Sequence, residues 1–239
     1  MSKSDPQNVH AGHRARLRSR YKRCGFDDFE EHEVLELLLF HAIPRANTNP
    51  IAHNLLKQFG SLYAVLNAKE EELCKVPGVG PASAALIRTV ADSVRAAKLK
   101  EIGSEPLVTW ERLYLYVTEW FLGKPAATVA VLLMDAQRRI ITVRTLAEEH
   151  LRRPESYPEE ILRLCQQMEA SYVVLMHNHV DGAMRPSSED IFLTQEIFRY
   201  LETNHVTLLE HVIVHELNAV PCLDTAMRKS VSGFPMTTR

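Results

Sequence analysis

The sequence predicts an α+β protein in which an N-terminal all-helical domain is followed by an α/β domain with a mixed sheet. Through the first hundred residues, apolar side chains recur at helical spacing and no segment has the pattern of a good strand. Beyond a polar segment, short apolar runs rich in β-branched residues alternate with helical segments. We therefore expect a helical domain over residues 1–100, a linker over 101–107 and a second domain over 108–239.

The helices of the first domain are predicted from their boundary residues. A basic segment at 10–24 can form a helix around Leu17 and Tyr21, and acidic residues then suit the start of a helix through VLELLLF at 34–40. The remaining signals are an Asn49-Pro50 start with a Gly60 end, a capping box from Asn67 to Glu70, and a Gly-rich turn at 76–81 that opens an Ala-rich helix to about Lys98.

The second domain is predicted as strands interleaved with helices. Thr109 can cap a helix through about Phe121, and the two apolar runs that follow, separated by a turn, indicate a hairpin. In chain order we expect strands at 127–135 and 140–146, a helix from Pro158 to about Glu169, a strand at 171–179, a helix from Ser187 to about Asn204 and a strand at 206–214.

Charge is unevenly distributed along the chain. The 28 basic and 30 acidic side chains give a net charge of −2, but residues 1–25 hold seven basic and one acidic residue, so a +6 arm precedes a remainder of −8. We expect this arm either to contact nucleic-acid phosphates or to form a solvated face that pairs with acids at 27–36. With 46% apolar and 24% charged residues in 239, disordered and collagen-like classes are excluded.

The cellular compartment of the protein is predicted from its N-terminal residues and its cysteines. The first twenty residues lack the apolar segment of a signal peptide, and no apolar run approaches the roughly 20 residues that span a bilayer. The four cysteines lie far apart and form no CxxC pair. We expect a cytoplasmic protein with reduced thiols and no membrane association.

The strongest chemical signal is the segment HNHVDGAMRPSSED at 177–190. His177 and His179 are two residues apart at the end of an apolar strand, so both imidazoles point to the same side of the sheet. Ser187 and Asp190 follow in the first turn of a helix, and the loop can bring the Asp190 carboxylate back to the imidazoles. Two His and one Asp leave a tetrahedral position open for water, which is the ligand count of a catalytic zinc site.

Structural interpretations of the same residues remain open. An S-x-x-D ahead of an apolar helix is also typical of a capping box. Two histidines in a strand can be structural or solvated, and His211 on the last strand can be a core histidine with a hydrogen-bond partner.

The order H-x-H, seven residues, S-x-x-D resembles the JAMM motif of the JAB/MPN zinc metalloproteins, whose fold is cytidine-deaminase-like. The HNH opening, the PS-x-x-D followed by Ile191 and Thr194, and LLEHVIV at 208–214 are similar to RadC, the bacterial DNA repair branch of this family. The resemblance covers nearly the whole chain, so it predicts a JAB/MPN metal-binding domain over 108–239.

The resemblance also implies roles for individual residues. It implies that His177, His179 and Asp190 hold Zn²⁺, that Ser187 stabilises the oxyanion or the attacking water, and that His211 matches a family histidine. It further implies a metal-dependent hydrolase of the metallopeptidase type that cuts a peptide or isopeptide bond in a protein substrate.

The sequence departs from the JAMM pattern at its general base. The glutamate of the pattern, eight residues before the aspartate that ends the first strand, corresponds to Ala127 here. Loss of a positioned general acid–base costs about 10²–10⁴ in rate. The acids that could substitute are Glu148, Glu149, Glu159, Glu160 and Asp181. Among them we single out Glu160, where the RadC pattern also has a glutamate, with first-turn dipole compensation as the alternative. Val180 to Ala183 also replace the usual Pro-Ser-Gly-Asp.

A second candidate site is the segment LCKVPGVGPASAALI at 73–87, which resembles a helix-hairpin-helix. Gly78 and Gly80 would let backbone N–H groups approach a phosphate, and Lys75 would add positive charge. Such a contact reads the DNA backbone and not the base sequence. A plain helical hairpin is the alternative. The predicted nucleic-acid-binding residues are Lys75, Gly78, Gly80, Arg14, Arg16 and Arg18.

Two functions therefore stand at this point. The first is a zinc hydrolase with an impaired catalytic base. The second is a catalytically weak or inactive DNA-associated module that acts in DNA repair or processing. The residues leave the substrate and the oligomeric state open.

Overall fold

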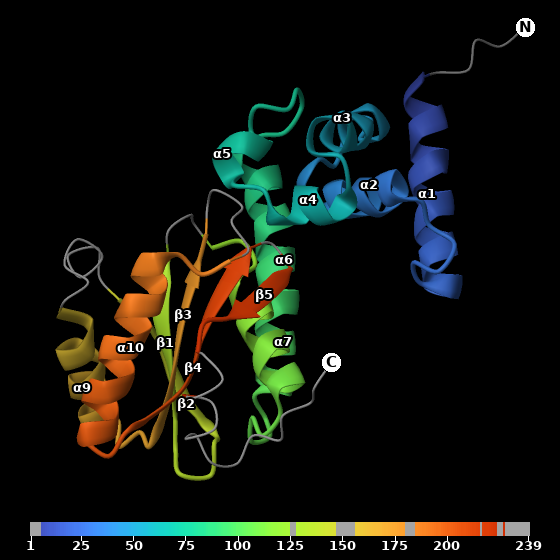
Figure 1. The fold of residues 1–239 in the computed structure, drawn as a ribbon. Helices are drawn as coiled ribbons and strands as arrows, with labels where there is room; N and C mark the ends of the chain where they lie inside the picture. The colour runs from blue at the N-terminus through green and yellow to red at the C-terminus, as the bar shows by residue number, and fades with distance from the viewer. Residues whose placement is uncertain are drawn as a thin grey trace, which may run out of the picture. The chain divides into compact units, whose positions relative to one another are not determined.

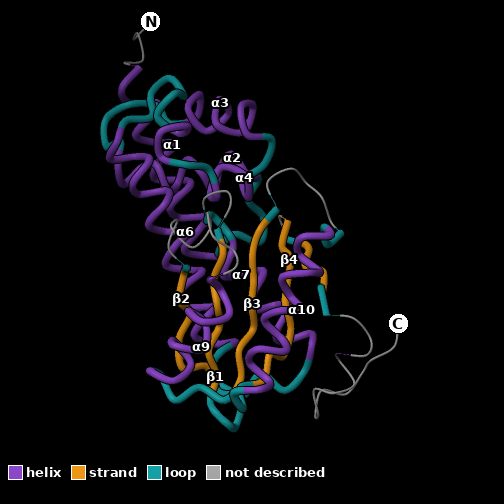
Figure 2. The backbone as a smooth tube through the Cα atoms, turned by 60° about the vertical axis from the view of Figure 1, so that its left-hand side comes forward, coloured by secondary structure: helices purple, strands orange, loops and turns teal. Residues whose placement is uncertain are grey.

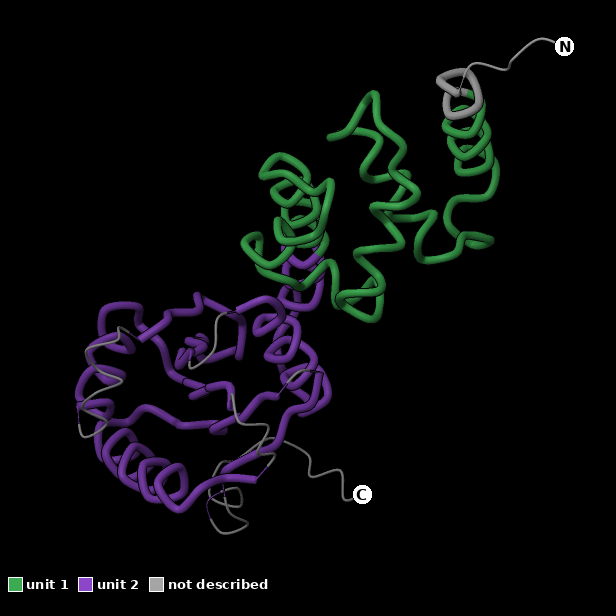
Figure 3. The backbone as a smooth tube through the Cα atoms, turned by 90° about the horizontal axis from the view of Figure 1, so that it is seen from above, with its two compact units in different colours: residues 1–94 green, residues 95–239 purple. Residues whose placement is uncertain are grey.

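The computed structural model divides the chain into two compact units, residues 1–94 and 95–239 (Figure 1, Figure 3). It describes residues 6–124, 128–146, 156–179, 185–215, 217–223 and 227, with side chains from Gly12 onward. The first unit is helical and the second contains a mixed sheet, so the predicted α+β class is confirmed. Helix α6 runs from Pro81 to Ile102, which makes the first two residues of the predicted linker helical.

The first unit is built from short helices around one apolar cluster. Its centre is formed by fully buried leucines of neighbouring helices, such as Leu35 and Leu55, together with Ile87 of α6. The helices that precede α6 are α1 (Pro6–Cys24), α2 (Glu31–Ala42), α3 (Asn49–Phe59), α4 (Leu62–Asn67) and α5 (Glu70–Leu73).

The helix boundaries in this unit follow local capping chemistry, with two corrections. Asn49 was expected to be the N-cap of the helix that Pro50 opens, but Thr48 is the N-cap and Asn49 is the first residue of α3. Gly60 ends α3 with a φ of 90°, as predicted. The predicted capping box from Asn67 to Glu70 is wrong, because Asn67 is the last residue of α4 and its side-chain amide donates to the carbonyl of Tyr63. The cap in this region is Ser61, whose Oγ accepts from the Ala64 N–H at the start of α4.

A tight turn joins α5 to α6. The Val76 carbonyl accepts a hydrogen bond of 3.0 Å from the Val79 N–H, with Pro77 and Gly78 between them. Gly78 has a φ of 92°, so the segment is a type II turn, in which Pro presets the second position and Gly supplies the positive φ of the third. An added Cβ at Gly78 would lie 2.8 Å from two carbons of Ile51, so close packing also requires glycine here.

Helix α1 is held to α2 and α3 through a buried acid. The Glu36 side chain is 1% exposed, and its two carboxylate oxygens contact His13 Nε2 at 2.9 Å and Asn49 Nδ2 at 2.7 Å. Arg20 of α1 forms an ion pair with Glu33 of α2. The basic helix is therefore partly neutralised by α2, as one of the two sequence interpretations anticipated.

The second unit is organised on a five-stranded sheet of order β2-β1-β3-β4-β5. Neighbouring strands are antiparallel except β3 and β4, which are parallel and joined by the crossover helix α10. The strands are β1 (Val129–Met134), β2 (Ile140–Thr145), β3 (Tyr172–Asn178), β4 (Thr207–His215) and β5 (Asn218–Pro221). The β1–β2 hairpin was predicted, whereas the short edge strand β5 was not.

Helices cover both faces of this sheet. Helices α9 (Tyr157–Gln167) and α10 (Ser188–Thr203) lie side by side on one face, and α7 (Trp110–Phe121) packs against β4 and β5 on the other (Figure 1, Figure 2). The hydrophobic core between these layers includes Leu113, Leu132 and Ile161, all fully buried. The sheet is thus fixed on both sides, and the carboxyl end of β3 becomes a rigid platform for the side chains that follow it.

No helix in the part of the chain that the structure describes is long and apolar enough to cross a membrane. All four cysteines are free thiols.

Candidate metal centre

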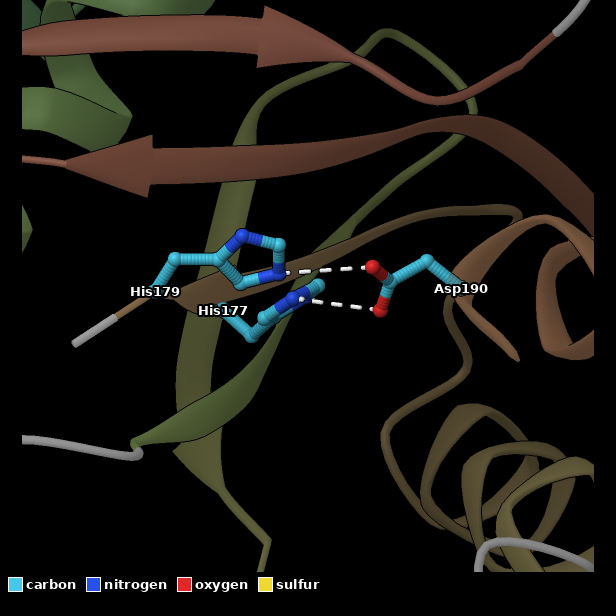
Figure 4. Close-up of side chains that lie close together, drawn as sticks. All are labelled: His177, His179 and Asp190. Carbon is cyan, nitrogen blue, oxygen red and sulfur yellow. Dashed lines mark ion pairs between the residues drawn. The ribbon is translucent and has the colours of Figure 1, made fainter. Parts of the chain in front are cut away.

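The three predicted ligands converge where β3 ends and α10 begins. His177 lies on β3 and His179 directly after it, and their imidazoles point toward the Asp190 carboxylate in the first turn of α10 (Figure 4). The His177 Nε2 atom is 3.3 Å from Asp190 Oδ1, and the His179 Nε2 atom is 3.3 Å from Asp190 Oδ2. Each side chain is 14–15% exposed, so the cluster is partly buried with an opening to solvent.

These donors fit a zinc ion. Each imidazole Nε2 lies 3.3 Å from one of the two Asp190 carboxylate oxygens, and one donor atom from each of the three residues lies within 4.8 Å of the others, which is close enough for the three side chains to share one ion. Among the described residues, this is the group of three His, Cys, Asp or Glu side chains whose donor atoms all lie within 4.8 Å of one another. With three protein ligands, a tetrahedral ion retains one position for water or substrate.

The protonation states also suit metal binding. Burial is the main cause that lowers the pKa of His177 to about 4, so its imidazole is neutral at pH 7 and offers a lone pair. Burial alone would raise the pKa of Asp190, but hydrogen bonds from the Ser187 side chain and backbone, together with the nearby imidazoles, leave it lowered. The site therefore presents a neutral imidazole beside a carboxylate.

Ser187 and Asp190 form a capping box as well as part of the cluster. The Asp190 N–H donates to Ser187 Oγ at 3.1 Å, and the Ser187 N–H donates to Asp190 Oδ2 at 2.8 Å. The Ser187 hydroxyl donates to the same Oδ2 at 2.7 Å. The structural interpretation of S-x-x-D is thus correct, and the cap itself orients Asp190 toward the two imidazoles.

His211 lies directly behind the first candidate ligand. Its Nε2 atom is 2.8 Å from His177 Nδ1, and its side chain is almost completely buried. A register shift between β3 and β4 places it there, because Val173 pairs with Leu208 but Val174 pairs with Glu210. Without this β-bulge, Glu210 would pair with Leu175 and would occupy the face that His211 now shares with His177.

The comparisons with known proteins identify the same region. A family model described as RadC-like JAB domain matches residues 107–225, which contain the cluster, and a helix-hairpin-helix model matches residues 61–90. The chain is 31% identical over 222 residues to the UPF0758 protein FN0909 of Fusobacterium nucleatum, covering 90% of this chain and 94% of the relative. The chain belongs to the RadC-like family. Its function is accordingly of the RadC type, associated with DNA repair.

The general base is the part of the predicted site of this RadC-like protein that the described residues do not supply. Ala127 lies outside the described residues, as do Asp181 and the rest of the altered loop at 180–183. Glu160 is in the first turn of α9, where its carboxylate accepts hydrogen bonds of 2.8 and 2.6 Å from Arg163. Within the described residues, Glu160 is not part of the metal-ligand group.

The predicted nucleic-acid residues fall into two groups. Gly80 is followed directly by α6, and an added Cβ there would meet no atom within 4 Å, so its surroundings are open. Arg16 and Arg18 are exposed on α1. Arg14 instead donates to the carbonyls of Ile43 and Ala46 and lies over a phenylalanine ring, so it has a structural role at the end of α2.

Two residues near the candidate sites were missed by the sequence interpretation. His215, to which the sequence interpretation gave no role, contacts the His179 carbonyl through Nδ1 at 3.0 Å and so helps to hold the second candidate ligand. Lys57 lies beside the glycine turn, lining a hollow of about 330 Å³ with Asn54, Gln58, Val76 and Pro77. The predicted Lys75 is exposed, and its ammonium group is 2.6 Å from Glu72.

Proposed function

We propose that this protein is a zinc-dependent hydrolase of the JAB type that acts on a peptide or isopeptide bond in a DNA-repair context. The observation that carries the proposal is the convergence of His177, His179 and Asp190, whose donor atoms lie within 4.8 Å of one another and form the three-ligand set of a catalytic zinc site. When bound, Zn²⁺ would supply a water molecule with a pKa of about 7 and would polarise the substrate carbonyl.

The residues of the chain would each contribute a defined step. His177 and His179 present imidazole nitrogens from a rigid strand end, which keeps two ligands in place before the metal arrives. Ser187 donates to Oδ2 of Asp190 and so restricts rotation of this carboxylate. Because the residue at the usual position of the general base is Ala127, we expect peptidase activity to be low.

Metal content of the purified full-length protein tests this proposal. We expect about one zinc ion per chain by elemental analysis, and loss of the zinc in His179→Ala. The control is His205→Asn, which removes an exposed imidazole from the same unit while keeping a residue that tolerates the φ of 60° at this position. Wild-type protein without zinc after growth in zinc-supplemented medium would refute the proposal.

A second proposed activity is sequence-independent DNA binding by the first unit. The type II turn at 76–79, the open surroundings of Gly80 and the match to the helix-hairpin-helix model all favour it. Backbone N–H groups at the start of α6 would donate to a phosphate, with Lys57, Arg16 and Arg18 as sources of positive charge.

A pair of charge substitutions on α6 tests the DNA contact. Gly80→Glu places a carboxylate at the turn, whereas Ala97→Glu adds the same charge to an exposed position sixteen residues beyond Pro81, about 24 Å along the helix. That separation exceeds the roughly 10 Å Debye length at 0.1 M salt. In fluorescence anisotropy titrations of duplex DNA, we expect Gly80→Glu alone to weaken binding and to reduce the salt slope by about 0.9, the value for one phosphate. Equal effects of the two substitutions would exclude a local contact at the turn.

A further inference from the structure

A chain of buried hydrogen bonds connects two of the candidate ligands behind the metal position. It starts at His177 Nδ1, which is 2.8 Å from His211 Nε2. It continues from His211 Nδ1 to Thr194 Oγ1 at 2.6 Å and ends where Thr194 Oγ1 meets the backbone carbonyl of Asp190 at 2.5 Å. His211 and Thr194 are each 1% exposed, so bulk water does not substitute for either partner.

The last contact of this series of hydrogen bonds determines where each of its protons lies. The carbonyl oxygen of Asp190 has no hydrogen, so the Thr194 hydroxyl must donate to it across the 2.5 Å separation. Thr194 Oγ1 has then used its one proton and must accept from His211, which places the His211 proton on Nδ1. The His211 nitrogens contact an imidazole and a hydroxyl, and the side chain is 1% exposed, so a second ring proton would place a buried charge there. The ring is therefore neutral and its Nε2 is an acceptor.

The same reasoning extends to the ligand itself. Because His211 Nε2 is an acceptor, His177 must donate from Nδ1, and the neutral His177 ring has its lone pair on Nε2. That atom is the one that lies 3.3 Å from Asp190 Oδ1. The Thr194 hydroxyl, which is not one of the candidate ligands, therefore sets the His177 tautomer that a metal requires.

We propose that Thr194 and His211 are positioning residues that hold His177 in the Nδ1–H tautomer and so prepare its Nε2 for metal binding. The inference rests on the proposed metal site. Thr194 lies one turn after Asp190 in α10. Its hydroxyl therefore links the Asp190 backbone to the imidazole of His211, which in turn contacts His177. Cys222 Sγ, 3.2 Å from Thr194 Oγ1, is a weak donor to the remaining lone pair of this hydroxyl.

A matched pair of substitutions separates this role from simple packing. Thr194→Val keeps the branched shape and removes the hydroxyl, whereas Thr194→Ser keeps the hydroxyl and removes a methyl group. In the valine variant, the Nδ1–H form of His211 has no acceptor, so the ring can transfer its proton to Nε2 and donate toward His177. His177 would then carry its proton on Nε2, the atom needed for the metal.

Long-range ¹H–¹⁵N NMR of the metal-free full-length protein reads these tautomers directly. The His177 signals are assigned by their loss in His177→Gln. We expect both His177 and His211 in the Nδ1–H form in the wild type and in Thr194→Ser, and a mixture with the Nε2–H form in Thr194→Val. A wild-type His177 with its proton on Nε2 would overturn the proposal, whatever the metal content.

Zinc affinity, measured by competition with a chromogenic chelator, is the second measurement. Replacement of a residue that supports a metal ligand typically costs 10–100-fold in affinity, and we expect a loss of this size in Thr194→Val and a change of less than about threefold in Thr194→Ser. His211→Phe should lose affinity similarly, and His211→Gln, whose amide oxygen can accept from His177, should retain more of it. Equal affinities of Thr194→Val and Thr194→Ser would contradict the proposal.

The two proposals fail differently. A wild-type protein that shows the expected tautomers but binds no zinc overturns the proposed hydrolase and supports the hydrogen-bond chain. A wild-type protein that binds zinc with His177 in the Nε2–H form before loading supports the metal site and overturns the positioning role. Thermal unfolding of each variant, followed by tryptophan fluorescence of the second unit, shows whether a lost affinity reflects lost folding.

Discussion

Substitution of Gly78 by alanine tests the geometry of the turn between α5 and α6. Two costs add at this position. A residue with a Cβ at a φ of 92° is strained by about 1–2 kcal/mol. The new Cβ would also lie 2.8 Å from Cδ1 and Cγ1 of Ile51, an overpacking that typically costs about 1–3 kcal/mol. We therefore expect Gly78→Ala to lower the free energy of unfolding of the first unit by about 2–5 kcal/mol.

The chain offers a matched control for this substitution. Gly60, at the end of α3, has a φ of 90°, and an added Cβ there would meet no atom within 4 Å. Gly60→Ala should therefore cost only the conformational term of about 1–2 kcal/mol. The difference between the two variants isolates the contact with Ile51, because the φ angles of the two glycines are nearly the same.

Urea unfolding of the two variants provides the measurement. Both tryptophans, Trp110 and Trp120, lie in the second unit, so their fluorescence follows that unit alone. Far-UV circular dichroism follows the helices of both units, so a change seen by circular dichroism but not by fluorescence belongs to the first unit. In an Ile51→Ala background, the cost of Gly78→Ala should fall to that of Gly60→Ala, since the clashing carbons are gone. If Gly78→Ala costs no more than Gly60→Ala in the wild-type background, the close approach inferred from the structure is wrong.

Three further predictions concern charge, pH and catalysis. Arg14→Ala should lower the free energy of unfolding of the first unit by about 1.5–3 kcal/mol in urea titrations, because two carbonyls lose a charged donor, whereas exposed Arg16→Ala should have no measurable effect. The stability of the second unit should fall as the pH rises from about 9 to about 12. Burial raises the pKa of Cys165 and of Tyr157 to about 12, so the unfolded chain loses these protons at a lower pH than the folded chain. Urea titrations across this pH range should show a smaller fall in Cys165→Val. Ala127→Glu should raise the cleavage of fluorogenic peptides by about 10²–10⁴-fold through a restored general base, and an equal rise in Ala127→Gln would exclude proton transfer as the reason.

Local signals in the sequence were sufficient to bring His177, His179 and Asp190 together, whereas their role as metal ligands stays a prediction. The alternation of a strand places His177 and His179 on one side, and the S-x-x-D pattern places Asp190 in a first helical turn, so each ligand is positioned by rules that act over a few residues. The same holds for the turn at Pro77 and Gly78. These features were predicted correctly because no distant part of the chain is needed to specify them.

Contacts that depend on register between distant segments were beyond the sequence interpretation. The strand LLEHVIV is apolar on both sides of the sheet apart from Glu210 and His211. Its pattern therefore does not reveal the bulge, which decides whether Glu210 or His211 lies on the same side as His177. Arg14 was predicted from its charge to contact nucleic acid, but only the fold shows that its partners are carbonyls 29 and 32 residues away. Strand β5 is four residues long and pairs with an edge, which leaves little periodicity to detect.

The double use of Ser187 and Asp190 bears on how such a protein would change during evolution. A helix cap is worth about 1 kcal/mol of stability, so selection for folding alone would retain these two residues in a descendant that no longer binds metal. His177 and His211 have no such protection, because buried polar groups in a sheet cost stability unless every partner is present. In RadC-like chains that lose the proposed chemistry, we therefore expect His177 and His211 to be replaced before Asp190.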